Sequence, residues 1–339
     1  MKLLRIIGTL LIVLVMSACS GKEEYKPVDI KLEKDLTIGG SEEDINQDFK
    51  FILSANVDEQ GNIYILDPNL SVVRKFDKNG QFLWELSQKG QGPGEFMRVV
   101  GLAVGQEGKV FIVDQNNRKI MIFSSAGHFV DEFKVIDGYP IKIAVDSRDF
   151  IYVNFLWRLK DFLIQKYSPR GEKITAFMEP RFGEEKDTFL RSTKNTIYFC
   201  LDQQDNIYVS YKFDYKLFKF SPTGKLLKTW TREFLGKPVE LKVIRDSNSI
   251  SVEGDLITQG IEADKHNNIY VLWGWMASEK GLLIDIFSPE GQYLGNFYSG
   301  VKPLEDWQYF HIDKKDNLYI IEPLKEPKLY RFKMLKSEK

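Results

Sequence analysis

The segment NVDEQGNIYILD at residues 56–67 decides the fold, because close copies of it recur along the chain. The further copies are AVGQEGKVFIVD (103–114), AVDSRDFIYVN (144–154), CLDQQDNIYVS (200–210), EADKHNNIYVL (262–272) and HIDKKDNLYII (311–321). Each copy has polar turn residues between two apolar stretches, which is the pattern of a tight β-hairpin. Five copies share an Asp before the turn, whereas Gly105 stands at this place in the second: Asp58, Asp146, Asp202, Asp264 and Asp313. We expect each Asp carboxylate to accept N–H hydrogen bonds within its own turn.

A second hairpin pattern follows each of the first five copies. These stretches are VVRKFDKNGQFLWEL (72–86), KIMIFSSAGHFVDEF (119–133), LIQKYSPRGEKITAF (163–177), KLFKFSPTGKLLKTW (216–230) and LIDIFSPEGQYLGNF (283–297). The sixth copy is followed only by KLYRFKML (328–335), so one strand is missing there. The alternating N-terminal segment VDIKL (28–32) can supply it and leave no free edge. The sequence therefore predicts an all-β, six-bladed β-propeller with four-stranded antiparallel blades, closed by an N-terminal strand that joins the last blade.

The repeated residues carry a family resemblance. The succession of D-x-x-G-N-I-Y-V and F-S-P-x-G is similar to NHL-repeat and related six-bladed propellers, and it covers nearly all of residues 28–335. The resemblance implies the fold. It does not imply one function, because the same propeller carries enzymes, binding proteins and scaffolds.

The glycine-rich stretch KGQGPGEF (89–96) is predicted to be a crossover between the first two blades. Its glycines allow sharp turns, Pro93 fixes one φ angle, and Phe96 can pack beneath the loop. A phosphate-binding loop would instead have Lys and Ser or Thr after the last glycine and then a helix. Glu95 follows that glycine here, and a strand is predicted next.

The first 19 residues have the pattern of a secretion signal, with Lys2 and Arg5 ahead of an apolar run. The end of this segment, MSAC (16–19), resembles a bacterial lipobox, although Met16 stands where Leu is usual. The resemblance implies that Cys19 is lipidated and tethers a soluble body to a membrane. An ordinary cleaved signal is the alternative. We therefore expect a signal peptide at 1–19, a tether at 20–27 and a single propeller domain at 28–336.

The segment after Cys19 bears on localisation. Ser20 rather than Asp follows the cysteine, which usually permits transfer to the outer membrane. The stretch SGKEE also resembles the export signal of surface lipoproteins in the Bacteroidetes. We expect a protein of the bacterial cell envelope, anchored by lipid to the outer membrane on its periplasmic side or its surface.

Composition limits the partners. The chain of 339 residues has 47 basic and 48 acidic residues, so its charge gives no argument for nucleic acid as a partner. Cys19 and Cys200 are its only cysteines, and lipidation of the first leaves no internal disulfide. Stability must come from packing.

Two residues before the repeated Asp, the six copies carry Asn56, Ala103, Ala144, Cys200, Glu262 and His311. Glu262, His311 and Asn56 belong to neighbouring blades, so we expect a polar cluster in the central channel, with Cys200 in the same ring. The families that this chain resembles include propeller lyases and lactonases, which use His and carboxylates around a channel metal. A catalytic zinc site needs about three protein ligands, whereas one histidine lies here. A hydrogen-bonded polar cluster or a water-filled channel is the alternative.

Aromatic residues gather in the connections at one end of the blades. They are Trp157 beside Arg158, Tyr211, Phe213, Tyr215, Trp273, Trp275 and Trp307. Such a rim suits a protein, peptide or glycan ligand, because flat rings give a large contact at low entropic cost. The long crossovers 178–196 and 232–260 could instead fold over these residues and bury them.

We therefore expect a membrane-tethered binding or scaffold module rather than an enzyme. The alternative is a metal-assisted lyase or hydrolase that uses Glu262, His311 and Asn56 with a divalent cation in the channel. No other cofactor is predicted. A third hypothesis is that the chain is a subunit of an envelope assembly and binds no small ligand.

Overall fold

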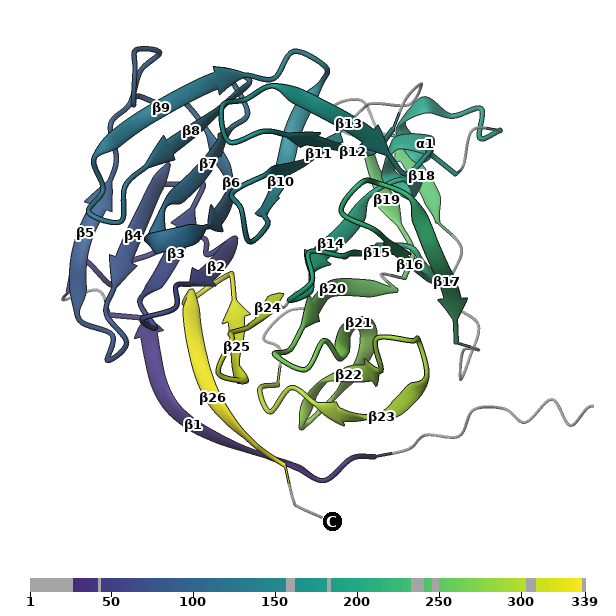
Figure 1. Cartoon of the computed structure of the whole chain (residues 1–339). Helices are drawn as coiled ribbons and strands as arrows, with labels where there is room; N and C mark the ends of the chain where they lie inside the picture. Colours follow the sequence, from purple (N-terminus) through teal and green to yellow (C-terminus); the bar gives the residue numbers. More distant parts are fainter. Residues whose placement is uncertain are drawn as a thin grey trace, which may run out of the picture.

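The computed structural model describes residues 27–41, 44–156, 162–181, 184–232, 241–245, 250–255, 257–302 and 309–336. Six four-stranded antiparallel sheets stand around a central axis (Figure 1). The predicted all-β, six-bladed propeller is confirmed. No helix in the described residues is long and apolar enough to cross a membrane.

The strands follow the chain from the axis outward in blades 1 to 5. Blade 1 has β2 (Ser54–Val57), β3 (Ile63–Asp67), β4 (Val72–Phe76) and β5 (Phe82–Leu86); blade 2 has β6 (Val99–Val104), β7 (Val110–Asp114), β8 (Lys119–Phe123) and β9 (Phe129–Lys134). Blade 3 has β10 (Tyr139–Val145), β11 (Ile151–Leu156), β12 (Ile164–Tyr167) and β13 (Lys173–Phe177); blade 4 has β14 (Ile197–Leu201), β15 (Ile207–Tyr211), β16 (Asp214–Phe220) and β17 (Leu226–Thr231). Blade 5 has β20 (Thr258–Ala263), β21 (Ile269–Ser278), β22 (Gly281–Phe287) and β23 (Tyr293–Tyr298).

Blade 6 closes the ring with strands from both ends of the chain. It consists of β24 (Tyr309–Ile312), β25 (Asn317–Glu322), β26 (Lys328–Lys336) and, outermost, β1 (Ile30–Gly39). The N-terminal β1 runs antiparallel to β26, from Ile30 opposite Lys336 to Gly39 opposite Lys328 (Figure 1). The strand begins two residues later than the predicted segment 28–32 and extends further, because its apolar alternation continues to the buried Ile38.

The repeated Asp organises the hairpin between the first two strands of each blade. In blade 1, Asp58 accepts from the backbone N–H of Asn62 at 2.8 Å and from the Tyr64 hydroxyl at 3.0 Å. The same pair of bonds occurs at the four other repeat Asp residues. Blade 2 has Gly105 for the Asp and Phe111 for the Tyr, so both partners are absent together. The expected Asp turn is confirmed, and the Tyr hydroxyl is its second partner.

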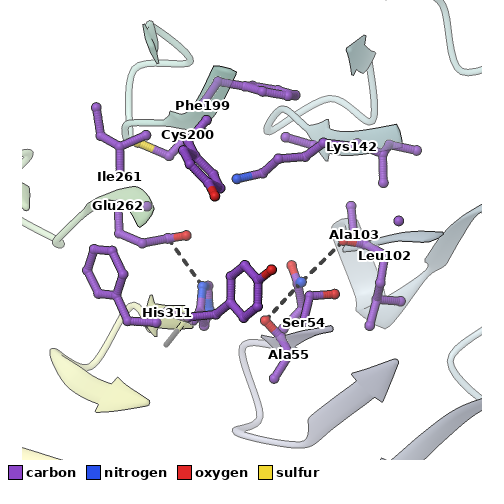
Figure 2. Close-up of a pocket in the computed structure, with 18 of the residues that line it drawn as sticks. Ser54, Ala55, Leu102, Ala103, Lys142, Phe199, Cys200, Ile261, Glu262 and His311 are labelled. Atoms are coloured by element: carbon purple, nitrogen blue, oxygen red, sulfur yellow. Dashed lines mark hydrogen bonds and ion pairs between the residues drawn. The ribbon is translucent and has the colours of Figure 1, made fainter. Parts of the chain in front are cut away.

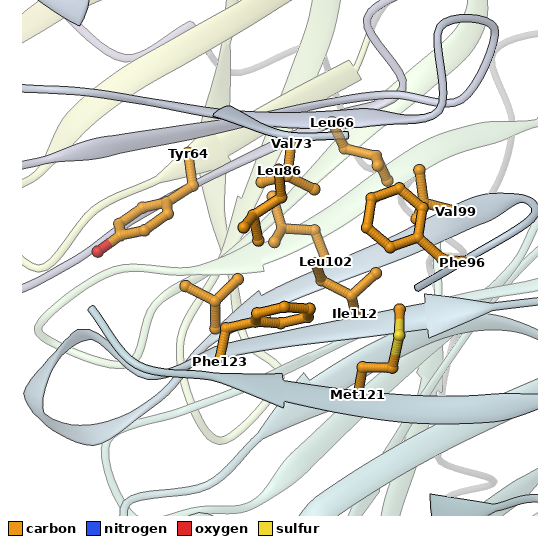
Figure 3. Packing of buried hydrophobic residues seen from close by; sticks show 11 residues of the cluster. Tyr64, Leu66, Val73, Leu86, Phe96, Val99, Leu102, Ile112, Met121 and Phe123 are labelled. Carbon is orange, nitrogen blue, oxygen red and sulfur yellow. The ribbon is translucent and has the colours of Figure 1, made fainter. Parts of the chain in front are cut away.

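Each blade packs on the next through an apolar layer. Between blades 1 and 2 the layer includes Leu66, Val73, Leu102 and Met121, together with Phe96 from the crossover (Figure 3). The predicted crossover KGQGPGEF lies between β5 and β6. Its Phe96 is fully buried, and the Phe96 N–H donates to the Gln88 carbonyl at 2.9 Å. The glycine-rich stretch is therefore a structural connection whose aromatic anchor fills the space between two blades.

Short elements decorate the connections. A 3-10 turn, η1 (Gln106–Gly108), lies in the first hairpin of blade 2. Helix α1 (Thr188–Lys194) lies in the crossover into blade 4 and begins at Asp187, whose carboxylate accepts from the N–H groups of Phe189 and Leu190. The hairpin of β18 (Lys242–Arg245) and β19 (Ile250–Glu253) lies in the crossover into blade 5. These elements extend the two crossovers that are long in the sequence.

Candidate functional site

The inner strands of all six blades surround a cavity of about 530 Å³ on the propeller axis (Figure 2). The strands that line it are β2, β6, β10, β14, β20 and β24. Binding pockets for small molecules usually have volumes of about 300–1,000 Å³. The cavity is therefore large enough for a small ligand.

Three sets of equivalent residues line the cavity, and each set has one residue from every blade. The His311 ring consists of Asn56, Ala103, Ala144, Cys200, Glu262 and His311. The Lys142 ring lies two residues earlier in each strand and consists of Ser54, Gly101, Lys142, Tyr198, Gly260 and Tyr309. The aliphatic ring lies immediately before the repeat Asp and consists of Val57, Val104, Val145, Leu201, Ala263 and Ile312.

His311 and Glu262 meet across the boundary between blades 6 and 5. The Nδ1 atom of His311 lies 3.2 Å from the Oε2 atom of Glu262, and each side chain is 19% exposed. Burial alone would lower the pKa of His311, but the charge and hydrogen bond of Glu262 outweigh burial, so this pKa is raised. The structure thus brings together two residues of the predicted channel cluster and favours a protonated imidazole beside a carboxylate.

The other two predicted channel residues do not join this pair. The Asn56 amide nitrogen donates to the carbonyls of Ala55 at 3.0 Å and Leu102 at 3.2 Å, which links blades 1 and 2. Cys200 is 7% exposed and packs in the apolar layer between blades 4 and 5. Burial raises the pKa of its thiol well above the ordinary value, which disfavours the nucleophilic thiolate.

Lys142 is a charged residue of the cavity wall that the sequence analysis missed. Its side chain extends into the cavity opposite Glu262 and His311 (Figure 2). Its Nζ atom lies 5.6 Å from the ring centre of Tyr198 and 5.5 Å from that of Phe199. Burial lowers the pKa of Lys142, while the negative charge of Glu262 opposes this change. Within the described part of the chain, no hydrogen bond or ion pair engages the Lys142 amine.

Two tyrosines and Ser54 complete the polar part of the Lys142 ring. Burial raises the pKa of Tyr309 to about 12 and raises that of Tyr198 well above its ordinary value, so both hydroxyls stay protonated donors. Neither hydroxyl has a hydrogen-bond partner among the residues that the structure describes. Strand periodicity could have pointed to this ring, because residues two apart in a strand share a face.

A metal centre finds little support in the described residues. They contain no group of three or more His, Cys, Asp or Glu side chains that could hold a metal ion. His311 and Glu262 alone would supply two ligands, whereas catalytic zinc sites use about three from the protein.

The predicted aromatic rim is wrong for three of its members, because Tyr211, Tyr215 and Trp273 are at most 2% exposed. Trp273 Nε1 donates to the buried carboxylate of Asp285 at 2.8 Å, and the Tyr215 hydroxyl donates to it at 2.6 Å. The two rings stack with centres 4.6 Å apart. This carboxylate also pairs with Arg232 at 2.6 Å, so Tyr215 and Trp273 hold a buried charged network together.

The other residues predicted for the rim, and the predicted anchor residue, are only partly covered by the described structure. Phe213 is half-buried, with the Lys212 amine 5.5 Å from its ring centre. Trp157, Arg158, Trp307, the side chain of Trp275 and the predicted lipidation site Cys19 lie outside the described residues.

The fold defines a six-bladed propeller with a cavity on its axis, and comparison with protein families agrees on the fold. Residues 52–271 match the model of a family described as 6-bladed beta-propeller (DUF5128). The chain belongs to this family. No curated protein sequence matches the chain significantly.

Solved structures with low sequence identity share the architecture. A putative exported protein from Bacteroides fragilis is 14% identical with a TM-score of 0.61, and the match covers 91% of this chain and 96% of that one. A DUF4221 family member from Bacteroides vulgatus is also 14% identical with a TM-score of 0.61, over 93% and 100% of the two chains. Virginiamycin B lyase from Staphylococcus aureus is 11% identical with a TM-score of 0.55, over 91% and 100%. At these identities the likeness concerns the fold alone.

Proposed function

We propose that this chain is a binding protein of the bacterial cell envelope and that the central channel, rather than the aromatic rim, holds its ligand. The observation that carries this proposal is a cavity of about 530 Å³ into which Lys142 points an amine that makes no hydrogen bond or ion pair with the described residues. Buried polar groups normally have hydrogen-bond partners, so a ligand or a water molecule in the cavity best explains how the Lys142 amine is hydrogen-bonded. The size of the cavity suits a small molecule, or the end of a peptide or glycan, and excludes a folded domain.

A thermal-shift screen tests the channel as a binding site. A ligand present at one hundred times its Kd stabilises the folded state by about 2.7 kcal/mol, which is readily measured. The half-buried Ala144 lines the channel, so Ala144→Phe places a ring in the ligand space. We expect ligands that stabilise the wild type to lose their effect in Ala144→Phe, and the smaller Ala144→Leu to weaken it. Stabilisation that is equal in all three proteins would place the ligand elsewhere and overturn the proposal.

A metal-assisted lyase or hydrolase is the second candidate. It is favoured by the contact of His311 with Glu262 in the channel. Virginiamycin B lyase has a similar fold, and its variant with one histidine replaced by alanine is described as catalytically inactive. Metal analysis of the purified protein, with melting curves measured with and without chelator, separates the candidates. Metal near one equivalent and a melting temperature lowered by chelator would favour the enzyme, whereas neither would count against it.

A further inference from the structure

We infer that the ligand of the central channel is a small organic monoanion, whose acid group binds at the Lys142 ring and whose apolar body extends to the aliphatic ring. This inference rests on the proposed function. It goes further by naming the chemical class of the ligand and the direction in which the ligand lies.

The Lys142 ring has the donors that an acid group needs. Lys142 supplies an ammonium group, and Tyr198 and Tyr309 supply hydroxyls that burial keeps protonated. An acid oxygen is a strong acceptor for such donors, and a charge-assisted bond is about twice as strong as a neutral one. Gly101 and Gly260 occupy the equivalent places in blades 2 and 5, where the side chains of Val113 and Phe310 pack against them, so the donors of this level come from the other blades.

The charges of the neighbouring His311 ring favour a ligand with a single negative charge. Its only carboxylate, that of Glu262, is bound to His311 at 3.2 Å. Glu262 also acts on the pKa of Lys142, which places the carboxylate within electrostatic reach of the amine. Arg98 also lines the cavity but is exposed to solvent, so the partly buried positive charge at this level is that of Lys142, and a monoanion balances it.

An apolar layer, the aliphatic ring, follows the His311 ring toward the turns of the repeat Asp residues, and beyond it Gln203, Asp313 and Lys314 line the cavity. The six residues of the aliphatic ring carry no polar side-chain atom. Ala103 and Ala144 are the small members of the His311 ring, so the space between the acid level and the aliphatic ring opens along blades 2 and 3. An apolar chain or ring that passes these alanines would bury surface at roughly 25 cal/mol per Å².

The test uses matched probes in ligand-observed NMR. The probes are octanoate and 4-phenylbutanoate, the corresponding amides, and octyl phosphate as a dianion. We expect both acids to bind at least about tenfold more tightly than their amides and than octyl phosphate. In Lys142→Met the affinity for the acids should fall by about tenfold or more, to that of the amides, whereas Lys142→Arg should keep part of the preference.

Control variants separate this inference from the proposed function. Lys314→Met removes the same charge at the channel lining, outside the Lys142 ring, and should leave binding of the acids unchanged. Equal binding of acids and amides, or unchanged binding of the acids to Lys142→Met, would overturn the inference that the ligand is a monoanion. Loss of all probes in Ala144→Phe would then still support a channel ligand, whereas binding of probes that Ala144→Phe does not affect would overturn the channel itself.

Discussion

At the scale of single residues, one turn position ties each of blades 3 to 6 to the preceding blade. Asp149, Asp205, Asn267 and Asp316 all have φ between 60° and 65°, and each side chain accepts from a backbone N–H of the preceding blade's turn. Asp and Asn tolerate this left-handed conformation better than most residues. Glycines stand at this position in blades 1 and 2, so both junctions of blade 1 lack the bond.

This arrangement predicts the effect of changing Asp205. Its carboxylate accepts from the Ser147 N–H at 2.9 Å and from the Ser147 hydroxyl at 2.7 Å. Asp205→Ala loses both bonds. It also leaves a residue with a Cβ atom but no side-chain acceptor in the left-handed conformation, at φ 63°. We therefore expect the free energy of unfolding to fall by about 2 kcal/mol. Asp205→Asn keeps an acceptor and should lose less than about 1 kcal/mol. Urea denaturation measures both, and equal losses would show that the bond between blades does not matter.

The pair of His311 and Glu262 predicts a pH dependence. The groups that act on His311 are Glu262 and Asp313, which raise its pKa, and Lys142, which lowers it. Since the pKa in the folded state is above the ordinary 6.5, the stabilisation is complete below about pH 6.5 and is lost as pH rises through the folded-state value. We expect His311→Gln to melt roughly 1–3 °C below the wild type at pH 5.5 and at nearly the same temperature at pH 8.5.

The exposed His266 provides the matched control for this experiment. His266→Gln should melt with the wild type at both pH values. A difference between His311→Gln and the wild type that grows toward high pH would contradict the assigned direction of the pKa change.

At the scale of strands and blades, the repeats predicted the architecture because they carry their own turn chemistry. The sixth copy lacked a strand, and this absence predicted the closure by β1. Helix α1 and the hairpin of β18 and β19 could not be foreseen from the repeats, because each occurs once. The prediction of an exposed rim was wrong at Tyr215 and Trp273 for a tertiary reason: the carboxylate to which both residues donate comes from Asp285 in β22.

The candidate site shows the same limit. Glu262 and His311 could be placed together because they occupy one position in adjacent repeats. Lys142 belongs to a single repeat and was missed, although it lies two residues before a member of the predicted ring. Whether a side chain in such a ring is engaged by its neighbours depends on the packing of other blades, as Asn56 shows by bonding to the Leu102 carbonyl.

The closing strand β1 makes a prediction of its own. Ile38 is 1% exposed and packs in the apolar layer between blades 6 and 1. Ile38→Ala should lower the free energy of unfolding by about 2–4 kcal/mol, since it leaves a cavity in this layer. Thr37 lies on the exposed face of the same strand, and Thr37→Ala should change the free energy by less than about 0.5 kcal/mol. Urea denaturation measures both variants, and a similar small change in each would mean that β1 contributes little to closure.

At the scale of the whole molecule, the position of β1 determines how an anchor would hold the propeller. β1 is the outermost strand of blade 6, so the chain approaches the ring at its perimeter rather than at the channel (Figure 1). The expected tether of residues 20–27 spans at most about 29 Å at full extension. A protein anchored through Cys19 would therefore lie close to the membrane, and attachment at the perimeter leaves the channel open to small molecules.

Lipidation of Cys19 is the prediction that decides this arrangement. We expect mass spectrometry to show that the mature N-terminal peptide begins at Cys19 and carries acyl chains. The protein should also partition into the detergent phase of Triton X-114, because more than one acyl chain gives stable membrane binding. Exchange of residues 1–19 for a cleavable signal without a terminal Cys should release the protein in soluble form with an unchanged melting temperature, since the propeller strands begin at Ile30. An unmodified mature N-terminus would contradict the anchor and leave the propeller and its channel as features of a freely diffusing exported protein.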